Sequence, residues 1–120
     1  MKELEREILL SFWKAHILHH AGEKPLHGQW VILELRRHGY EISAGTLYPL
    51  LHRMERLGWL KGTTDPDGGK RARKDYRLTS QGRNILRVVR EHIKELHHEV
   101  VLEGNEAVKE RRRRVRPKRL

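Results

Sequence analysis

Cysteine is missing from the 120-residue sequence, and its absence excludes disulfide bonds, thiolate metal sites and a cysteine nucleophile. No apolar stretch approaches the roughly 18 residues that a membrane-spanning helix requires. The N-terminus carries acidic residues where a secretory signal has a basic region followed by an apolar run. These absences predict a soluble, cytoplasmic protein.

Recognisable catalytic patterns are missing as well. The sequence has no glycine-rich phosphate loop, and Ser43 and His52 share one predicted helix without an acidic residue to orient the histidine. We therefore predict that the protein is not an enzyme and uses no cofactor.

Basic charge, in contrast, is abundant. The formal net charge is +10, and such an excess favours a phosphate-bearing partner, either nucleic acid or an anionic membrane surface. Residues 109–120 (KERRRRVRPKRL) hold eight basic residues and one acidic residue, a net +7. We predict that they form a disordered tail, which by itself does not identify the partner because basic tails bind many acidic molecules.

The spacing of apolar residues predicts three helices, a hairpin and a final helix. Ile8, Phe12 and Leu18 lie on the apolar side of the first helix, and glycines at 22, 39 and 58 are placed to end the first three helices. The predicted elements are helices over 4–20, 29–38 and 43–57, strands over 59–63 and 72–78, and a long helix capped by Thr79.

Three short helices followed by a two-stranded hairpin are typical of a winged helix-turn-helix domain. The predicted fold class is therefore mainly α with a small β-hairpin wing, although other small α-rich domains fit the pattern too. We assign residues 1–78 to this domain, 79–108 to a C-terminal dimerisation helix and 109–120 to the basic tail.

The third predicted helix carries a short polar and basic face opposite its apolar one. Hydroxyl, imidazole and guanidinium groups donate hydrogen bonds to phosphates and base edges, so this face suits a helix whose N-terminal half enters the major groove of DNA. Ser43 is a good N-cap residue, and Pro49 is expected in or near the first turn because it costs about 3 kcal/mol deep in a helix. The alternative is an ordinary amphipathic helix with a solvated face.

The predicted hairpin is basic. Lys70, Arg71, Arg73 and Lys74 are placed to contact the DNA backbone or to reach the minor groove. The alternative is a solvated turn.

The last helix carries an apolar stripe. An exposed stripe of this length needs a partner, so we predict that two chains bury their stripes against each other. The stripe consists of Leu86, Val89, Ile93, Leu96 and Val100.

Several motifs together resemble the PadR family of bacterial transcriptional regulators. Gly-Thr-Leu-Tyr-Pro at 45–49, Leu-His-Arg-Met-Glu at 51–55 and Gly-Trp-Leu at 58–60 carry the resemblance. Pro-Leu-His-Gly at 25–28 and Lys-Asp-Tyr-Arg-Leu-Thr-Ser-Gln-Gly at 74–82 lie in the matching order. One departure is Gln29-Trp30, where the family has Tyr-Glu.

The resemblance implies a winged-helix dimer joined through its C-terminal helix with help from the first helix. It also implies a repressor that releases DNA when a small molecule binds, and we expect it to recognise a palindromic operator. A ligand-independent, architectural DNA-binding protein and a winged-helix protein-interaction module remain alternatives. The residues that match the DNA-contacting motif are Ser43, Thr46, Tyr48, Pro49, His52 and Arg53.

Two further groups of residues invite a ligand. Phe12 and Trp13 are candidates for an aromatic-binding effector cavity at the dimer interface, although core packing is the commoner fate of such residues. His16 and His20 have the i, i+4 spacing of helical metal ligands, but no cysteine and no evident carboxylate completes a set. The sequence therefore favours surface histidines and predicts no metal site.

Overall fold

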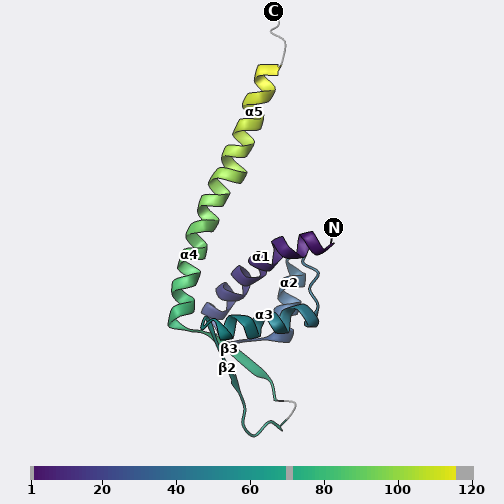
Figure 1. Ribbon diagram of the computed structural model, residues 1–120, viewed down its shortest axis with the longest axis vertical. Helices are drawn as coiled ribbons and strands as arrows, with labels where there is room; N and C mark the ends of the chain where they lie inside the picture. The colour runs from purple at the N-terminus through teal and green to yellow at the C-terminus, as the bar shows by residue number, and fades with distance from the viewer. Residues whose placement is uncertain (1, 70–71, 116–120) are drawn as a thin grey trace, which may run out of the picture. The chain divides into compact units, whose positions relative to one another are not determined.

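A computed structural model describes residues 2–69 and 72–115 of the chain (Figure 1). The chain divides into two compact units, Met1–Leu86 and Arg87–Leu120. Among the described residues, every helix is too short or too polar to span a lipid bilayer.

The first unit has the predicted order of elements, with one strand added. It is a winged helix, which confirms the predicted fold class: mainly α with a small β wing. Its elements are α1 (Lys2–Glu23), β1 (Leu26–His27), α2 (Gly28–Arg37), α3 (Ala44–Arg56), β2 (Leu60–Thr64), β3 (Lys74–Leu78) and the start of α4 (Ser80–Leu96).

The three strands form one antiparallel sheet in the order β1-β3-β2. Tyr76 of the central strand pairs with Leu26 on one side and with Gly62 on the other. Tyr76 and Leu78 are buried and Arg77 between them is exposed, which is the alternation expected of a strand with one face on the core. β2 and β3, paired from Leu60↔Leu78 to Thr64↔Lys74, extend away from the helices as the wing (Figure 1).

α2 and α3 each end at a glycine with a positive φ angle. Gly39 and Gly58 have φ angles of 92° and 83°, a conformation that glycine adopts without steric cost. At the end of α3, the N–H of Trp59 donates to the carbonyl of Met54 and the N–H of Gly58 donates to that of Glu55, the Schellman pattern. Both predicted helix ends are confirmed, whereas α1 passes Gly22 and ends at Glu23.

The buried side of α1 differs from the predicted one. Trp13, Ile17 and Leu18 are at most 3% exposed, whereas Ile8 and Phe12 are 62% and 47% exposed. Leu18 of the predicted apolar side therefore belongs to the core, as does Trp13, which was expected alongside it, whereas Ile8 and Phe12 do not. α3 packs against α2 and β2 and buries Leu47, Leu50, Leu51 and Met54.

Thr79 joins the sheet to α4. Its hydroxyl donates to the carbonyl of Gly58 (2.5 Å) and accepts from the N–H of Gly82 (2.9 Å), so Thr79 caps the helix as predicted. Gly82 lies so close to the chain before β2 that a Cβ there would overlap the carbonyl oxygen of Trp59. α4 therefore begins at a fixed place against the wing.

The second unit is helical throughout its described residues. After α4 it consists of the π-helical segment η2 (His97–Glu103) and α5 (Gly104–Val115). The prediction of a single helix followed by a disordered tail from residue 109 is wrong for 109–115, which are helical; 116–120 lie outside the described residues. Glu110 approaches Arg113 and Arg114 at i, i+3 and i, i+4 spacing, the pairing that supports an exposed helix.

Replacing Gly82 by alanine tests the close approach at the start of α4. The new Cβ would meet backbone that cannot rotate away, so we expect the free energy of unfolding to fall by about 1–3 kcal/mol, measured by urea denaturation. Gly45→Ala is the matched control, because a Cβ at Gly45 has no neighbour closer than Ser43 Oγ at 3.8 Å. Unchanged stability of Gly82→Ala would contradict the packing described for α4.

Candidate nucleic-acid interface

The polar face of α3 is exposed along its length. Tyr48, Pro49, His52 and Arg53 are all exposed, with Tyr48 at 39%, and Thr46 is half-buried at the start of the helix. α3 thus presents together the side chains that the sequence predicted to lie on one face.

The start of α3 differs from the prediction for Ser43. Ser43 occupies the N-cap position with extended backbone, but its side chain makes no capping hydrogen bond. Its hydroxyl instead donates to the hydroxyl of Thr46 at 3.4 Å. The first N–H groups of the helix are therefore not satisfied by the Ser43 side chain, and they point where the helix dipole favours an anion.

Pro49 lies deeper in α3 than predicted. α3 begins at Ala44, which places Pro49 in the second turn. Proline has no N–H, so the carbonyl of Gly45, four residues earlier, receives no helical hydrogen bond from it. Near the start of α3, the N–H groups of Thr46 and Leu47 donate to the carbonyl of Ser43.

A hollow of about 410 Å³ brings α3, the start of α2 and the wing together. Tyr48 and His52 line it from α3, and Arg73 and Lys74 line it from the wing. Gln29 of α2 lines the same hollow and was not among the predicted contact residues. The Pro-Leu-His-Gly motif that precedes it was the available signal, because this motif places Gln29 at the start of α2.

Tyr48 is held across the start of α2. A Cβ at Gly28 would lie 2.5–2.8 Å from the phenol ring of Tyr48, closer than any side chain can approach. Only glycine at this position lets the ring lie there. The absence of a side chain at position 28 thus leaves the space that the Tyr48 ring occupies at the rim of the hollow.

Glu55 connects α3 to both strands of the wing. One carboxylate oxygen accepts from Lys74 Nζ at 2.9 Å and the other accepts from the N–H of Gly62 at 2.8 Å. The hydrogen bond that Lys74 donates to Glu55 lowers the pKa of Glu55 and raises the pKa of Lys74. Burial raises the pKa of Tyr76, whose ring lies beneath the Lys74 ammonium.

The basic residues of the wing do not share one environment. Lys74 is engaged with Glu55, so it anchors the wing and offers less charge to a phosphate than the sequence suggested. Arg73 lies 3.2 Å from Asp75, but its side chain is 66% exposed. Lys70 and Arg71 lie outside the described residues.

A second hollow, of about 1050 Å³, lies between α1 and the segment that joins α2 to α3. Trp13, Tyr40 and Thr46 are among its lining residues, and Phe12 is not. Trp13 is 3% exposed and meets Tyr40 edge to face, whereas Phe12 is 47% exposed. The two side chains therefore do not line this hollow together; a shared cavity at a dimer interface stays a prediction.

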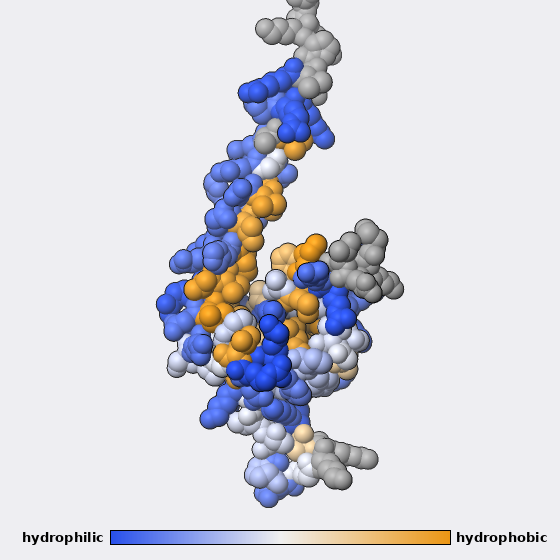
Figure 2. Space-filling view, in the orientation of Figure 1, coloured by the Kyte–Doolittle hydropathy of each residue, from blue (hydrophilic) through white to orange (hydrophobic). Residues whose placement is uncertain are grey.

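The second unit carries an apolar stripe along its helices (Figure 2). Ile93, Leu96 and Val100 are 48–64% exposed, and Val89 is half-buried. Leu86 differs, because it is 6% exposed and buried within the first unit; it has little surface left for a second chain. Four further apolar residues are exposed that were not part of the predicted stripe: Val88, Val101, Leu102 and Val108.

Known proteins share this arrangement. A family model described as the transcriptional regulator PadR-like family matches residues 17–88. The transcriptional regulator Rv3488 of Mycobacterium tuberculosis is 45% identical over 101 residues, which are 84% of this chain and 90% of that protein.

Solved structures extend the similarity to the fold. A Streptococcus transcriptional regulator superimposes with a TM-score of 0.70 at 27% identity, covering 82% of this chain and 96% of that one. A PadR family transcriptional regulator from Eggerthella lenta has a TM-score of 0.62 at 36% identity, covering 90% of this chain and 87% of that one.

The ion pair between Glu55 and Lys74 predicts a pH dependence of stability. Because folding lowers the pKa of Glu55, its contribution is present above the ordinary pKa near 4.5 and is lost as the pH falls through the folded value. Glu55→Gln should therefore flatten the loss of stability in acid, measured by urea denaturation between pH 7 and pH 3. A double-mutant cycle with Lys74→Met should give a coupling of about 0.2–1 kcal/mol, since both side chains are partly exposed.

Glu41→Gln is the control for this measurement, because Glu41 is an exposed glutamate on the segment between α2 and α3. An acid profile that changes equally in the two variants would show that Glu55 has no special place in the wing.

Proposed function

The chain belongs to the PadR-like family of transcriptional regulators, and we propose that it binds double-stranded DNA as a homodimer and represses transcription. The observation that carries this proposal is the hollow where α3 meets the wing, because Tyr48, His52 and Arg73 line it together. A recognition helix and a basic hairpin on one surface are what a winged helix needs to contact bases and backbone at once.

The residues have different proposed roles. Ser43 and Thr46, at the uncapped start of α3, contact a phosphate. Tyr48, Pro49, His52 and Arg53 face the major groove. Arg73, together with Lys70 and Arg71, contacts the backbone or the minor groove beside it, and Lys74 positions the wing.

The homodimer is proposed from the apolar stripe of the second unit. Ile93, Leu96 and Val100 are exposed, and exposed stripes of this kind mark protein contacts. A symmetric dimer places two recognition helices about one turn of DNA apart, roughly 34–36 Å, and so reads a palindromic operator. Exposed Ile8 and Phe12 of α1 support a contribution of the first helix to the same assembly.

The basic residues of α5 are proposed to add affinity without specificity. Arg111, Arg112, Arg113 and Arg114 are all exposed, and neutralising phosphates with such residues releases counterions regardless of sequence. Their contribution should therefore weaken with salt for every DNA.

A small effector is proposed to act through the hollow of about 1050 Å³. Trp13 and Tyr40 offer aromatic surface there, and Ser43 and Thr46 line the same hollow from the start of α3. A ligand in this place would touch residues that are proposed to contact phosphate, and it would thereby change the affinity for DNA.

Arg53→Ala tests the role of α3. The side chain is exposed, so the fold should persist, while binding to DNA fragments that the protein selects from its own genome should weaken by about 1–3 kcal/mol. Arg83→Ala, which removes an equal and exposed charge from α4, is the control. Equal affinity of the two variants in a fluorescence titration would remove this face of α3 from the DNA interface.

Leu96→Asp tests whether assembly and operator recognition depend on the same stripe. An unpaired carboxylate is too unfavourable to bury, so the variant should sediment as a monomer and lose its preference for the full palindrome over a half-site. Lys94→Asp is the control, because Lys94 lies on the other side of α4 two residues away. A dimeric Leu96→Asp protein would exclude the stripe as the interface, and a monomer with full operator affinity would exclude the two-half-site mechanism.

A further inference from the structure

We propose that His16, His20 and His38 bind a divalent transition-metal ion, with the carboxylate of Glu34 as a fourth ligand. The site lies in the first unit, between α1 and the end of α2, and none of its four residues belongs to the proposed DNA surface. It can therefore be tested without DNA, and it does not depend on the proposed function.

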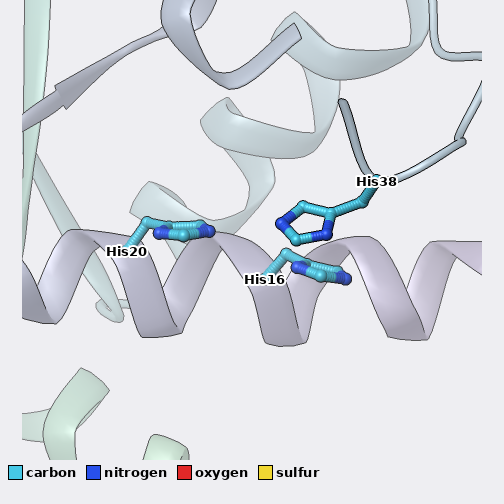
Figure 3. Close-up of side chains that lie close together, drawn as sticks. All are labelled: His16, His20 and His38. Atoms are coloured by element: carbon cyan, nitrogen blue, oxygen red, sulfur yellow. The ribbon is translucent and has the colours of Figure 1, made fainter. Parts of the chain in front are cut away.

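The three imidazoles converge from two parts of the chain (Figure 3). His16 and His20 lie one helical turn apart on α1, and their rings stack at 16° with centroids 6.3 Å apart. His38 follows the last residue of α2 and brings its ring to 5.0 Å from that of His16. One nitrogen of each ring lies within 4.8 Å of a nitrogen of the other two.

The carboxylate of Glu34 lies beside two of these histidines, His38 and His20. Its Oε1 lies 3.2 Å from His38 Nε2 and 3.8 Å from His20 Nε2, and its side chain is only 13% exposed. Zinc binds imidazole nitrogens and carboxylate oxygens at about 2.0–2.2 Å, so small rotations of the rings are needed to close the four donors around one ion. Arg37 Nη2 donates to the same Oε1 at 2.6 Å, and Arg37 Nε donates to Oε2 at 3.1 Å. The guanidinium therefore holds the carboxylate in place and would share Oε1 with the ion.

His20 already has the arrangement of a metal ligand. Its Nδ1 lies 3.1 Å from Glu23 Oε1, and a ligating histidine commonly donates its second N–H to a carboxylate in this way. With the proton on Nδ1, the lone pair is on Nε2. This Nε2 is buried and has no hydrogen-bond partner, although a buried polar atom without a partner costs free energy. A metal ion at the centre of the cluster would satisfy it.

The donor set indicates the class of ion. Three imidazoles and one carboxylate suit Zn²⁺ and neighbouring ions such as Co²⁺ and Ni²⁺, whereas Ca²⁺ and Mg²⁺ require mainly oxygen ligands. Cu⁺ prefers thiolate and thioether sulfur, which no residue of the cluster offers. We therefore assign the site to a zinc-like divalent ion.

A competing group shares one member with the proposed site. His19, His20 and Glu23 also lie within 4.8 Å of one another, but His19 and Glu23 are 51% and 58% exposed. In that group Glu23 would have to bind the ion, whereas in the proposed site it orients His20 from behind. The residues that the two groups do not share distinguish them.

The experiment consists of two titrations of the full chain. Binding of Zn²⁺ alone is measured by calorimetry, and binding of Co²⁺ is measured by visible absorption. We expect one strongly bound ion per chain and a Co²⁺ spectrum of tetrahedral intensity. His38→Gln should weaken binding at least tenfold and abolish the Zn²⁺-dependent rise in melting temperature. His19→Gln, the matched control in the competing group, should leave both unchanged.

The outcomes separate the alternatives. Loss of binding in His19→Gln with full binding in His38→Gln would move the ion to the competing group and overturn the proposal, as would the absence of a stoichiometric ion in the wild type. If His38→Gln melts at a lower temperature than the metal-free wild type, His16→Gln decides instead, because it removes a different ligand of the proposed site and none of the competing group.

Discussion

The carboxylate of Glu55 determines where the wing lies relative to α3. It receives a hydrogen bond from Lys74 on β3 and another from the backbone of Gly62 on β2, so one helical side chain holds both strands. A partly exposed ion pair contributes little to stability by itself. Its importance is geometric: Tyr48 and His52 belong to α3 and Arg73 belongs to the wing, and the hollow that they share depends on keeping the two elements together.

Close backbone approaches complete this constraint. The ring of Tyr48 lies where any side chain at position 28 would be, and α4 begins where a side chain at position 82 would meet the carbonyl of Trp59. Glycine at position 28 lets the Tyr48 side chain of α3 lie against the start of α2, and glycine at position 82 lets the start of α4 lie against the backbone of Trp59. Some residues of the surface proposed to contact DNA therefore also hold the fold: the Tyr48 ring packs over Gly28, and Lys74 is paired with Glu55.

Two sides of α1 face different parts of the first unit. Trp13, Ile17 and Leu18 form part of the core, while His16 and His20 lie beside the end of α2 with Glu34 and His38. These groups are adjacent in sequence because a helix turns by about 100° per residue. The proposed ion would therefore lie outside the core, and it would join α1 to His38, six residues before α3 begins at Ala44.

The sequence by itself determined the order of elements, the helix ends at Gly39 and Gly58, the cap at Thr79 and the polar face of α3. Each of these follows from local chemistry: apolar periodicity, a positive φ, a hydroxyl at the right offset. What it could not determine depends on residues far apart in the chain. The buried side of α1 was mispredicted because Ile8 and Phe12 fit a helical stripe as well as Trp13 and Ile17 do, and only contact with α2, α3 and the sheet selects between the two stripes.

The candidate sites divide in the same way. Four exposed residues of α3 could be named from their spacing, but their meeting with Arg73 and Gln29, and the capture of Lys74 by Glu55, required the folded chain. Leu86 fitted the periodicity of the final helix, yet the first unit buries it. The histidine cluster shows the limit most clearly: His16 and His20 are a visible i, i+4 pair, whereas His38 and Glu34 join them only because α2 packs against α1, and no spacing along a sequence records that contact.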